Sequence, residues 1–92
     1  MNGAKTFLLR EYIMTHDLKV LTDYIRDELG YDGPLDPDTD LLEERILDSF
    51  SVVQMIVYIQ SEFGIEFEPE ELVLENLSRL SGMLALIEKY KG

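Results

Sequence analysis

The chain has 92 residues, a formal net charge of −11 and no cysteine, and 46% of its residues are hydrophobic. This length predicts one domain, and the apolar content is typical of a folded chain rather than a disordered one. The acidity argues against nucleic acid or anionic membranes as partners, and the lack of cysteine excludes disulfides, thiolate catalysis and cysteine-based metal sites. No apolar run is long enough for a membrane span or a signal-peptide core, so we expect a cytoplasmic protein. We also expect it to be a monomer.

The first 30 residues are expected to be helical. Residues 5–14 form either a separate short helix or an extension of the next one, with apolar residues on one side: Phe7, Leu8, Tyr12 and Ile13. Residues 1–13 are therefore treated as an N-terminal extension and residues 14–92 as the main domain. The first helix of that domain is predicted to begin at Thr15, a suitable N-cap, and to end at Gly30. Its apolar residues recur at helical spacing: Leu18, Leu21, Ile25 and Leu29.

Residues 31–47 form a long loop, because Gly33-Pro34 and Asp36-Pro37 are turn signals. Loops of this length in small domains are often functional. The apolar residues expected to hold it against the body are Leu35, Leu41, Leu42 and Ile46.

The alternation of Asp36, Asp38 and Asp40 in this loop invites comparison with a calcium-binding loop. An EF-hand requires glycine at its sixth position and glutamate at its twelfth. Counting from Asp36, these positions hold Leu41 and Leu47, so a calcium-binding protein is the less favoured alternative.

The second long helix is predicted over residues 49–63, ended by Gly64. The expected inner face consists of Phe50, Val53, Ile56 or Val57, Ile59 or Gln60, and Phe63. Pro69 then favours the start of a short helix that ends near Leu74.

The last helix is expected to start at a cap formed by Ser78 or Asn76 and to end near Lys91. The residues expected to face inward are Leu80, Met83 or Leu84, and Ile87, and Lys89 and Lys91 complement the negative end of the helix dipole. Gly82 is expected to weaken this helix slightly. The predicted fold is all-α, with three long helices, one short helix, a long loop between the first two, and a helical segment added at the N-terminus.

Asp48 and Ser49 stand where the long loop meets the second helix. Both residue types cap helices, and a phosphate joined to Ser49 would lie at the positive end of the helix dipole. A nucleophilic serine needs a neighbouring base, and the single histidine, His16, is distant in sequence. Ser49 is therefore either a capping residue or an acceptor for a group added by another enzyme.

An ordered set of motifs then resembles the acyl carrier protein family over about residues 14–91. The set begins with Leu47-Asp48-Ser49-Phe50 and continues with Glu62-Phe63-Gly64-Ile65, Pro69-Glu70-Glu71 and Asn76-Leu77-Ser78-Arg79-Leu80. Phe50 replaces the family's usual leucine, and the residues before Asp48 look more like D-alanyl and aminoacyl carriers than fatty-acid carriers.

This resemblance implies a four-helix acyl-carrier bundle with 4′-phosphopantetheine on Ser49, added from coenzyme A by a Mg²⁺-dependent phosphopantetheinyl transferase that recognises Asp48. The arm would hold an acyl or aminoacyl group as a thioester and bring it from an activating ligase to acyl-processing enzymes. The chain itself would not be an enzyme. The cargo stays open among fatty-acid, polyketide, aminoacyl and specialised lipid pathways, and the alternative function is an unmodified interaction module.

The second helix differs from those of fatty-acid carriers because its expected outer face has few acids. We therefore expect partner enzymes to dock by apolar contact on Phe50, Val52, Met55 and Tyr58. If the helices part to shelter a carried chain, the lining is expected to be Val53, Ile56, Ile59 and Phe67.

Overall fold

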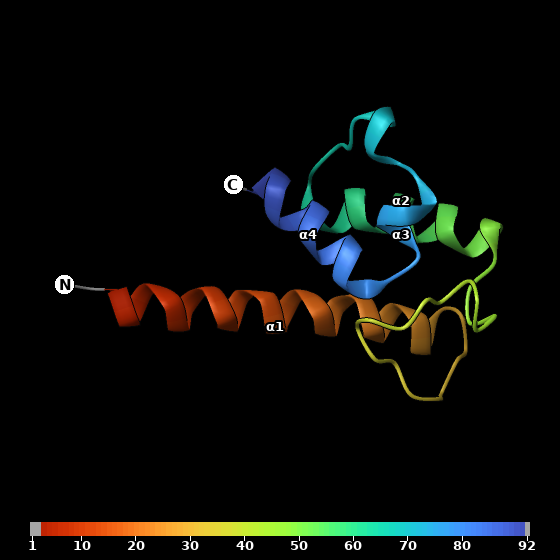
Figure 1. Ribbon diagram of the computed structural model, residues 1–92, viewed down its shortest axis with the longest axis horizontal. Coiled ribbons are helices and arrows are strands. Elements are labelled where there is room, and N and C mark those ends of the chain that lie inside the picture. The colour runs from red at the N-terminus through yellow and green to blue at the C-terminus, as the bar shows by residue number, and fades with distance from the viewer. Residues whose placement is uncertain (1–2, 92) are drawn as a thin grey trace.

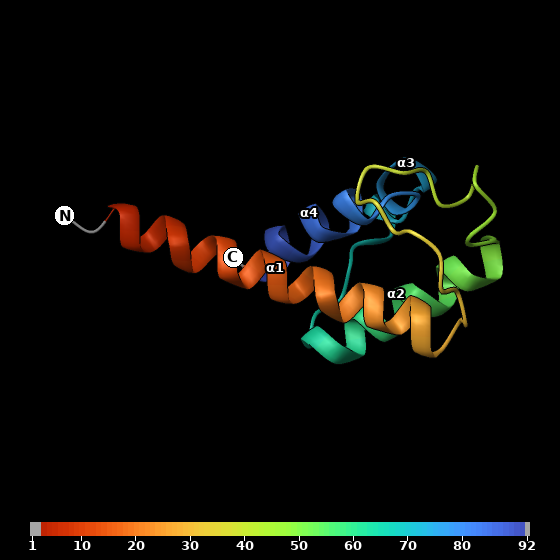
Figure 2. The same ribbon diagram turned by 90° about the horizontal axis from the view of Figure 1, so that it is seen from below.

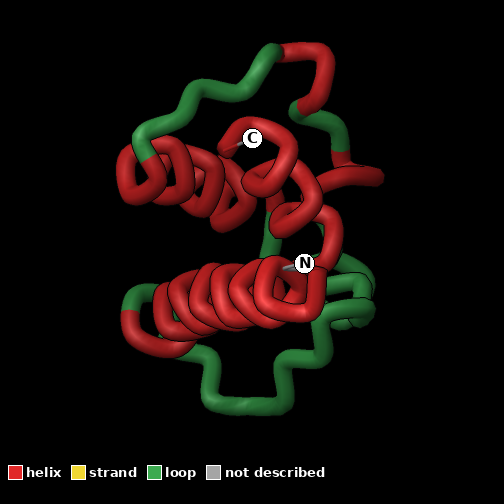
Figure 3. The backbone as a smooth tube through the Cα atoms, turned by 90° about the vertical axis from the view of Figure 1, so that its left-hand side faces the viewer, coloured by secondary structure: helices red, strands yellow, loops and turns green. Residues whose placement is uncertain are grey.

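The structure is a computed structural model that describes residues 3–91, and over this range it contains helices and loops but no strands (Figures 1 and 3). The helices are α1 (Gly3–Asp27), α2 (Ser49–Phe63), the 3₁₀ turn η1 (Pro69–Glu71), α3 (Leu74–Leu77) and α4 (Leu80–Lys91). The predicted all-α fold, with its long loop between the first two long helices, is confirmed.

The N-terminal segment is an extension of the first helix, because α1 continues from Gly3 through Thr15 to Asp27 without a break. The predicted helix start at Thr15 is therefore wrong. The first part of α1 projects beyond the other helices (Figures 1 and 2) and exposes Leu8, Leu9 and Tyr12. Residues 1 and 2 of the expected extension, and the side chain of Phe7, lie outside the part that the structure describes.

The core forms where α4 packs against α1 and α3 and where the inner face of α2 meets them. Its fully enclosed residues come from three helices and the long loop: Leu21, Ile25, Leu41, Met55, Ile59, Leu80, Met83 and Ile87. Burying such side chains stabilises a domain by about 1.5–3 kcal/mol each. A 92-residue chain therefore builds its core from all of its long elements.

The inner face of α2 differs in part from the predicted one, since Ile59 is buried and Ile56 and Phe63 pack against the core as expected. Its buried residues are Val52, Met55 and Ile59, whereas the expected inner residues Phe50, Val53 and Val57 are 71%, 55% and 60% exposed. Apolar residues occur on nearly every side of this helix, so two helical registers compete. The positions of α1 and α4 decide between them.

Gly64 ends α2 as predicted, because it adopts a left-handed conformation (φ 65°) and the Ile65 N–H donates to the Gln60 carbonyl at 3.1 Å. The predicted short helix over 69–74 is instead two elements, η1 and the four-residue α3.

The predicted capping of α4 by Asn76 or Ser78 is wrong. The Asn76 side chain donates to the Glu71 carbonyl (2.9 Å), and α4 begins after Arg79, whose carbonyl accepts from the Met83 N–H (3.1 Å). Gly82 has a second role besides lowering helix propensity. A Cβ atom there would lie 2.3 Å from the Asn76 carbonyl oxygen, so only glycine allows this close approach of α4 to α3.

The long loop is held against the junction of α3 and α4 by backbone hydrogen bonds. The Leu41 N–H donates to the Ser78 carbonyl (2.7 Å), and the Ser81 N–H donates to the Pro37 carbonyl (2.9 Å). Together with the burial of Leu41 and Leu47, these bonds fix the direction from which the chain enters α2.

Two aspartates of the calcium-like pattern form turns of this loop. Asp36 accepts from the Asp38 N–H (2.8 Å), and Asp40 accepts from the Leu42 and Glu43 N–H groups (3.1 and 3.0 Å). Among the side chains that the structure describes, no group of three or more acidic or histidine residues is placed to hold a metal ion. The carboxylates thus act in local turn formation.

Candidate functional site

The site is built at the first turn of α2, where the long loop ends. Asp48 is the N-cap, with extended backbone (φ −118°, ψ −177°), and its Oδ1 accepts a 2.8 Å hydrogen bond from the Ser51 N–H. This bond from the Ser51 backbone, followed by one from the Ser51 side chain, lowers the pKa of Asp48 below its ordinary value. Asp48 is therefore an ionised, exposed carboxylate.

Ser49 follows as the first residue of α2, and its side chain is exposed. Because Asp48 provides the cap, the Ser49 hydroxyl is not needed for that purpose, and it makes no hydrogen bond to any other residue in the described range. The sequence allowed Ser49 to be either the helix cap or an acceptor for an added group, and this geometry argues against the capping role.

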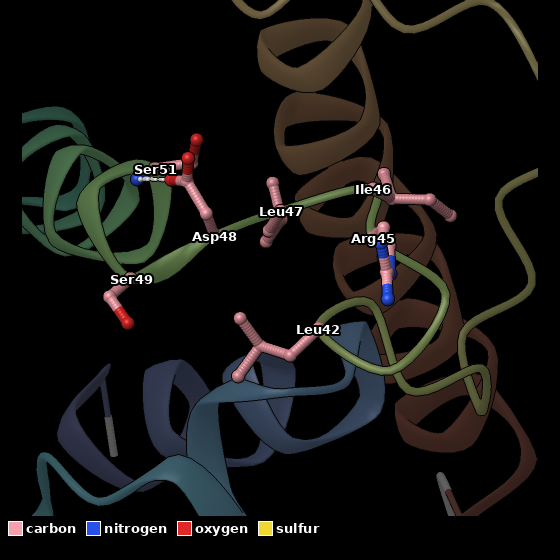
Figure 4. Close-up of a pocket in the computed structure, with 7 residues that line it drawn as sticks. All are labelled: Leu42, Arg45, Ile46, Leu47, Asp48, Ser49 and Ser51. Carbon is pink, nitrogen blue, oxygen red and sulfur yellow. Dashed lines mark hydrogen bonds between the residues drawn. The ribbon is translucent and has the colours of Figure 1, made fainter.

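An open pocket of about 400 Å³ adjoins this hydroxyl. Residues of the loop and of the first turn of α2 line it: Leu42, Arg45, Ile46, Leu47, Asp48, Ser49 and Ser51. Figure 4 shows the Ser49 hydroxyl on one side of the pocket and the Arg45 guanidinium on the other, with Leu42 and Leu47 between them. The lining holds no histidine or lysine that could act as a general base, so the pocket suits an attached group better than catalysis by Ser49.

Arg45 closes a turn that shapes this pocket. The Ile46 N–H donates to the Leu41 carbonyl (2.9 Å) and the Arg45 N–H donates to the Leu42 carbonyl (3.1 Å), which together form a Schellman motif. Arg45 has φ 61° and is the only non-glycine residue of the described range in the left-handed region. Glycine is preferred at this position, and an L side chain there costs roughly 1–2 kcal/mol. The sequence analysis did not single out Arg45, because no glycine marks the left-handed position.

The expected docking surface is corrected in part. Val52 and Met55 are 4% and 0% exposed, so neither is available on the surface, and Tyr58 is half-buried and stacks on Tyr24 with ring centroids 4.2 Å apart. Phe50 is exposed at 71%. The residues that share its outward side are instead Val53 and Val57, at i+3 and i+7.

The expected lining for a sheltered chain is corrected at one position. Val53 is exposed, whereas Ile59 and Phe67 are buried and Ile56 is partly buried against the core. None of these four belongs to the pocket beside Ser49, whose apolar wall comes from Leu42, Ile46 and Leu47 of the loop. Sequence reasoning assigned two of these loop residues only to holding the loop in place.

The residues present fit a covalently attached phosphopantetheine arm. The Ser49 hydroxyl, which has no partner in the described range, is of a kind that could carry such an arm, Arg45 supplies the pocket lining with a cation, and the apolar side chains of Leu42, Ile46 and Leu47 complete the lining. The chain has no cysteine, so a thiol can enter its chemistry only on such a group.

Comparison with known proteins agrees with this arrangement. The family model described as "Phosphopantetheine attachment site" matches residues 19–87. The "Acyl carrier protein" of Solidesulfovibrio magneticus is 28% identical over 71 residues, which are 76% of this chain and 88% of that protein. Among solved structures, a chain of "Crystal structure of FAD-dependent dehydrogenase" is 32% identical with a TM-score of 0.62, over 73% of this chain and 97% of that chain.

The family match covers most of the chain, including the C-terminal part of α1, the long loop that leads into the site and all of α2. Members of this family are generally carriers rather than catalysts. The chain belongs to the acyl carrier protein family and has the family's covalently attached 4′-phosphopantetheine as its prosthetic group.

Proposed function

We propose that Ser49 is the attachment residue and that the chain is a discrete, non-catalytic carrier. It holds an acyl or aminoacyl group as a thioester and delivers it to partner enzymes. The single observation that carries the proposal is the exposed Ser49 hydroxyl, which has no partner in the described range and stands at the edge of the pocket while Asp48 caps α2. Tethering raises the effective concentration of the carried group at a partner's active site.

The attachment step is a phosphoryl transfer from coenzyme A. The Ser49 oxygen forms a bond to phosphorus, the pyrophosphate bond of coenzyme A breaks, and adenosine 3′,5′-bisphosphate leaves. The hydroxyl proton goes to a base on the transferase. When bound, the group supplies the thiol on which the thioester forms.

The test is intact-mass spectrometry after incubation with coenzyme A, Mg²⁺ and a broad-specificity phosphopantetheinyl transferase. We expect a mass increase of one phosphopantetheinyl group, no increase in Ser49→Ala, and full loading of the matched variant Ser51→Ala. Ser51 lies two residues further along the same helix turn and also lines the pocket, so it controls for local disturbance. A folded wild-type chain that stays unmodified would refute the carrier function and favour an interaction module.

Asp48 is proposed to assist recognition by the transferase, since its carboxylate is ionised and exposed beside Ser49. Its capping role must be separated from this one. In Asp48→Asn the side-chain oxygen still caps the helix while the charge is lost. We expect slower loading of this variant with unchanged helix content by circular dichroism, whereas equal loading rates would remove the recognition role.

Partner enzymes are proposed to dock on an apolar stripe defined by Phe50, Val53 and Val57. These side chains are exposed, follow one side of α2 and begin one residue after Ser49. Apolar contacts are weakly screened by salt, so binding through the stripe is expected to depend little on ionic strength. Binding to a loading enzyme, measured by titration calorimetry, should fall in Val57→Asp and be unchanged in Ser61→Asp, one helical turn further on. Equal losses in both variants would contradict docking on the stripe.

The cargo is proposed to be acyl or aminoacyl. The residues before Asp48 resemble those of aminoacyl carriers, which gives the aminoacyl class its support. The intact mass of the protein purified from its native host identifies the carried group directly. Because a similar chain occurs in a structure titled for an FAD-dependent dehydrogenase, we include that enzyme class among the partners to be tested for binding to loaded carrier.

A further inference from the structure

Arg45 is an exposed cation whose side chain makes no hydrogen bond or ion pair within the described range. It is the only basic residue in the segment 32–48, which contains seven acids. The other nearby arginine, Arg79, is occupied: its Nε donates to the Asp38 carbonyl (3.0 Å) and its guanidinium lies 4.0 Å from Asp40. The Arg45 guanidinium has no hydrogen bond or ion pair with any residue in the range that the structure describes.

The backbone at Arg45 places this cation in the lining of the pocket, on the side opposite Ser49 (Figure 4). Arg45 occupies the left-handed position that closes the turn over residues 41–46, a position that favours glycine. Ile46 and Leu47, which follow it, lead directly into Asp48, so the turn, the pocket and α2 form one short connected unit.

Attachment of the arm changes the electrostatics of this unit. A phosphodiester on Ser49 carries one negative charge and lies next to the ionised Asp48 carboxylate, so the two repel each other. Arg45 lines the same pocket and is the only cation in that lining (Figure 4). A guanidinium can donate two parallel hydrogen bonds to two phosphate oxygens, which a lysine cannot do.

We propose that Arg45 binds the phosphodiester of the arm and so holds the first part of the arm over the apolar pocket wall of Leu42 and Leu47. This inference rests on the proposed attachment at Ser49. In the unmodified chain the Arg45 side chain has no partner in the described range, and the phosphodiester added on modification provides one.

The test compares apo and fully loaded protein, with loading verified by intact mass, for wild type, Arg45→Gln and Arg45→Lys. One readout is urea unfolding, from which the ratio of loaded to apo folding constants is obtained. We expect Arg45→Gln to lower this ratio roughly two- to fivefold at low salt, the range for an exposed ion pair, and the effect to disappear in about 1 M salt. Arg45→Lys should lower it less.

A second readout is the ³¹P resonance of the loaded protein. We expect it to shift in Arg45→Gln, and high salt to move the wild-type resonance toward that of the variant. The matched control is Lys19→Gln, which removes an exposed cation from α1 and should leave both readouts unchanged.

Arg45→Gly separates the backbone from the side chain. We expect it to stabilise the apo protein by relieving the left-handed strain, while the modification-dependent ratio falls as it does in Arg45→Gln. If loaded wild type and Arg45→Gln give the same ratio and the same ³¹P resonance, the inference fails and the carrier function stands. If wild type cannot be loaded at all, the proposed function fails and this inference fails with it.

Discussion

Replacing Met55 by alanine tests whether the face of α2 that carries Met55 belongs to the core or to the docking surface. Met55 is 0% exposed and belongs to the core cluster that also contains residues of α1 and α4, whereas Val57, two positions on, is 60% exposed. Truncation of a buried methionine to alanine costs about 2–5 kcal/mol, because both the transfer free energy and a residual cavity count. The free energy of unfolding of a domain of this size is about 5–14 kcal/mol, so Met55→Ala should remove a large share of it.

The matched variant is Val57→Ala, on the exposed stripe. Its free energy of unfolding should stay within about 0.5 kcal/mol of wild type, because little surface is buried there and alanine favours a helix. Urea unfolding followed by circular dichroism measures both values, and the same proteins are then assayed for binding to a loading enzyme. We expect Met55→Ala to weaken binding only where the protein unfolds, and Val57→Ala to weaken it while fully folded.

The reasoning fails if Met55→Ala unfolds within about 0.5 kcal/mol of wild type and weakens partner binding. Met55 would then be a surface contact, as the sequence pattern suggests, and not part of the core.

Gly82→Ala should destabilise the fold by about 1–3 kcal/mol despite the better helix propensity of alanine, because its Cβ would lie 2.3 Å from a backbone oxygen of α3. A urea midpoint at or above that of wild type would contradict this close approach. Lys91→Met should lower the free energy of unfolding by about 1–3 kcal/mol, because it leaves the buried Asp17 carboxylate, 3.0 Å from Lys91 Nζ, without its cation. In a double-mutant cycle, adding Asp17→Asn should recover part of this loss, whereas additive losses would show that the two side chains are not coupled. Hydrogen bonds from Lys89 and, to a smaller extent, from Tyr90 lower the folded-state pKa of Glu71. The ionised carboxylate therefore stabilises the fold at pH values above its ordinary pKa, and this stabilisation is lost as the pH falls through the lowered pKa. The urea midpoint of Glu71→Gln should accordingly lie below that of wild type at neutral pH and approach it in acid, whereas a constant gap would exclude the linkage.

The helix boundaries that the sequence predicted correctly at both ends of α2, and nearly so at the end of α1 (Asp27, against the predicted Gly30), have local chemical causes. Gly64 and Gly30 adopt left-handed conformations near the ends of α2 and α1, and Asp48 caps α2 through its own side chain. Such signals depend on a few neighbouring atoms, so they can be recognised without knowing the fold. For the same reason the junction at Ser49 could be located from the sequence.

The side of α2 that faces the core could not be predicted, because its cause is not local. Apolar residues at Phe50, Val53 and Val57 follow one helical stripe, and those at Val52 and Met55 follow another. Periodicity gives both stripes similar weight, and only the tertiary positions of α1 and α4 decide which one is buried. The exposed stripe is the one that remains available for partners.

The pocket beside Ser49 was missed for a related reason. Its apolar wall consists of loop residues, which have no periodic pattern, and Arg45 occupies a left-handed position without the glycine that usually marks it. The exclusion of Asn76 as the cap of α4 rests on a different, local contact, the hydrogen bond from its side chain back to the Glu71 carbonyl.

The projecting part of α1 is a suitable place to attach a label or a tag. The Gly3 end of this helix and the Ser49 end of α2 lie at opposite ends of the molecule, whose longest dimension is 45 Å (Figures 1 and 2). A fluorophore or an immobilisation tag joined before α1 would therefore be remote from the thiol of the arm and from any enzyme bound near it. Rates of loading and transfer measured with such a label should equal those of the unlabelled carrier.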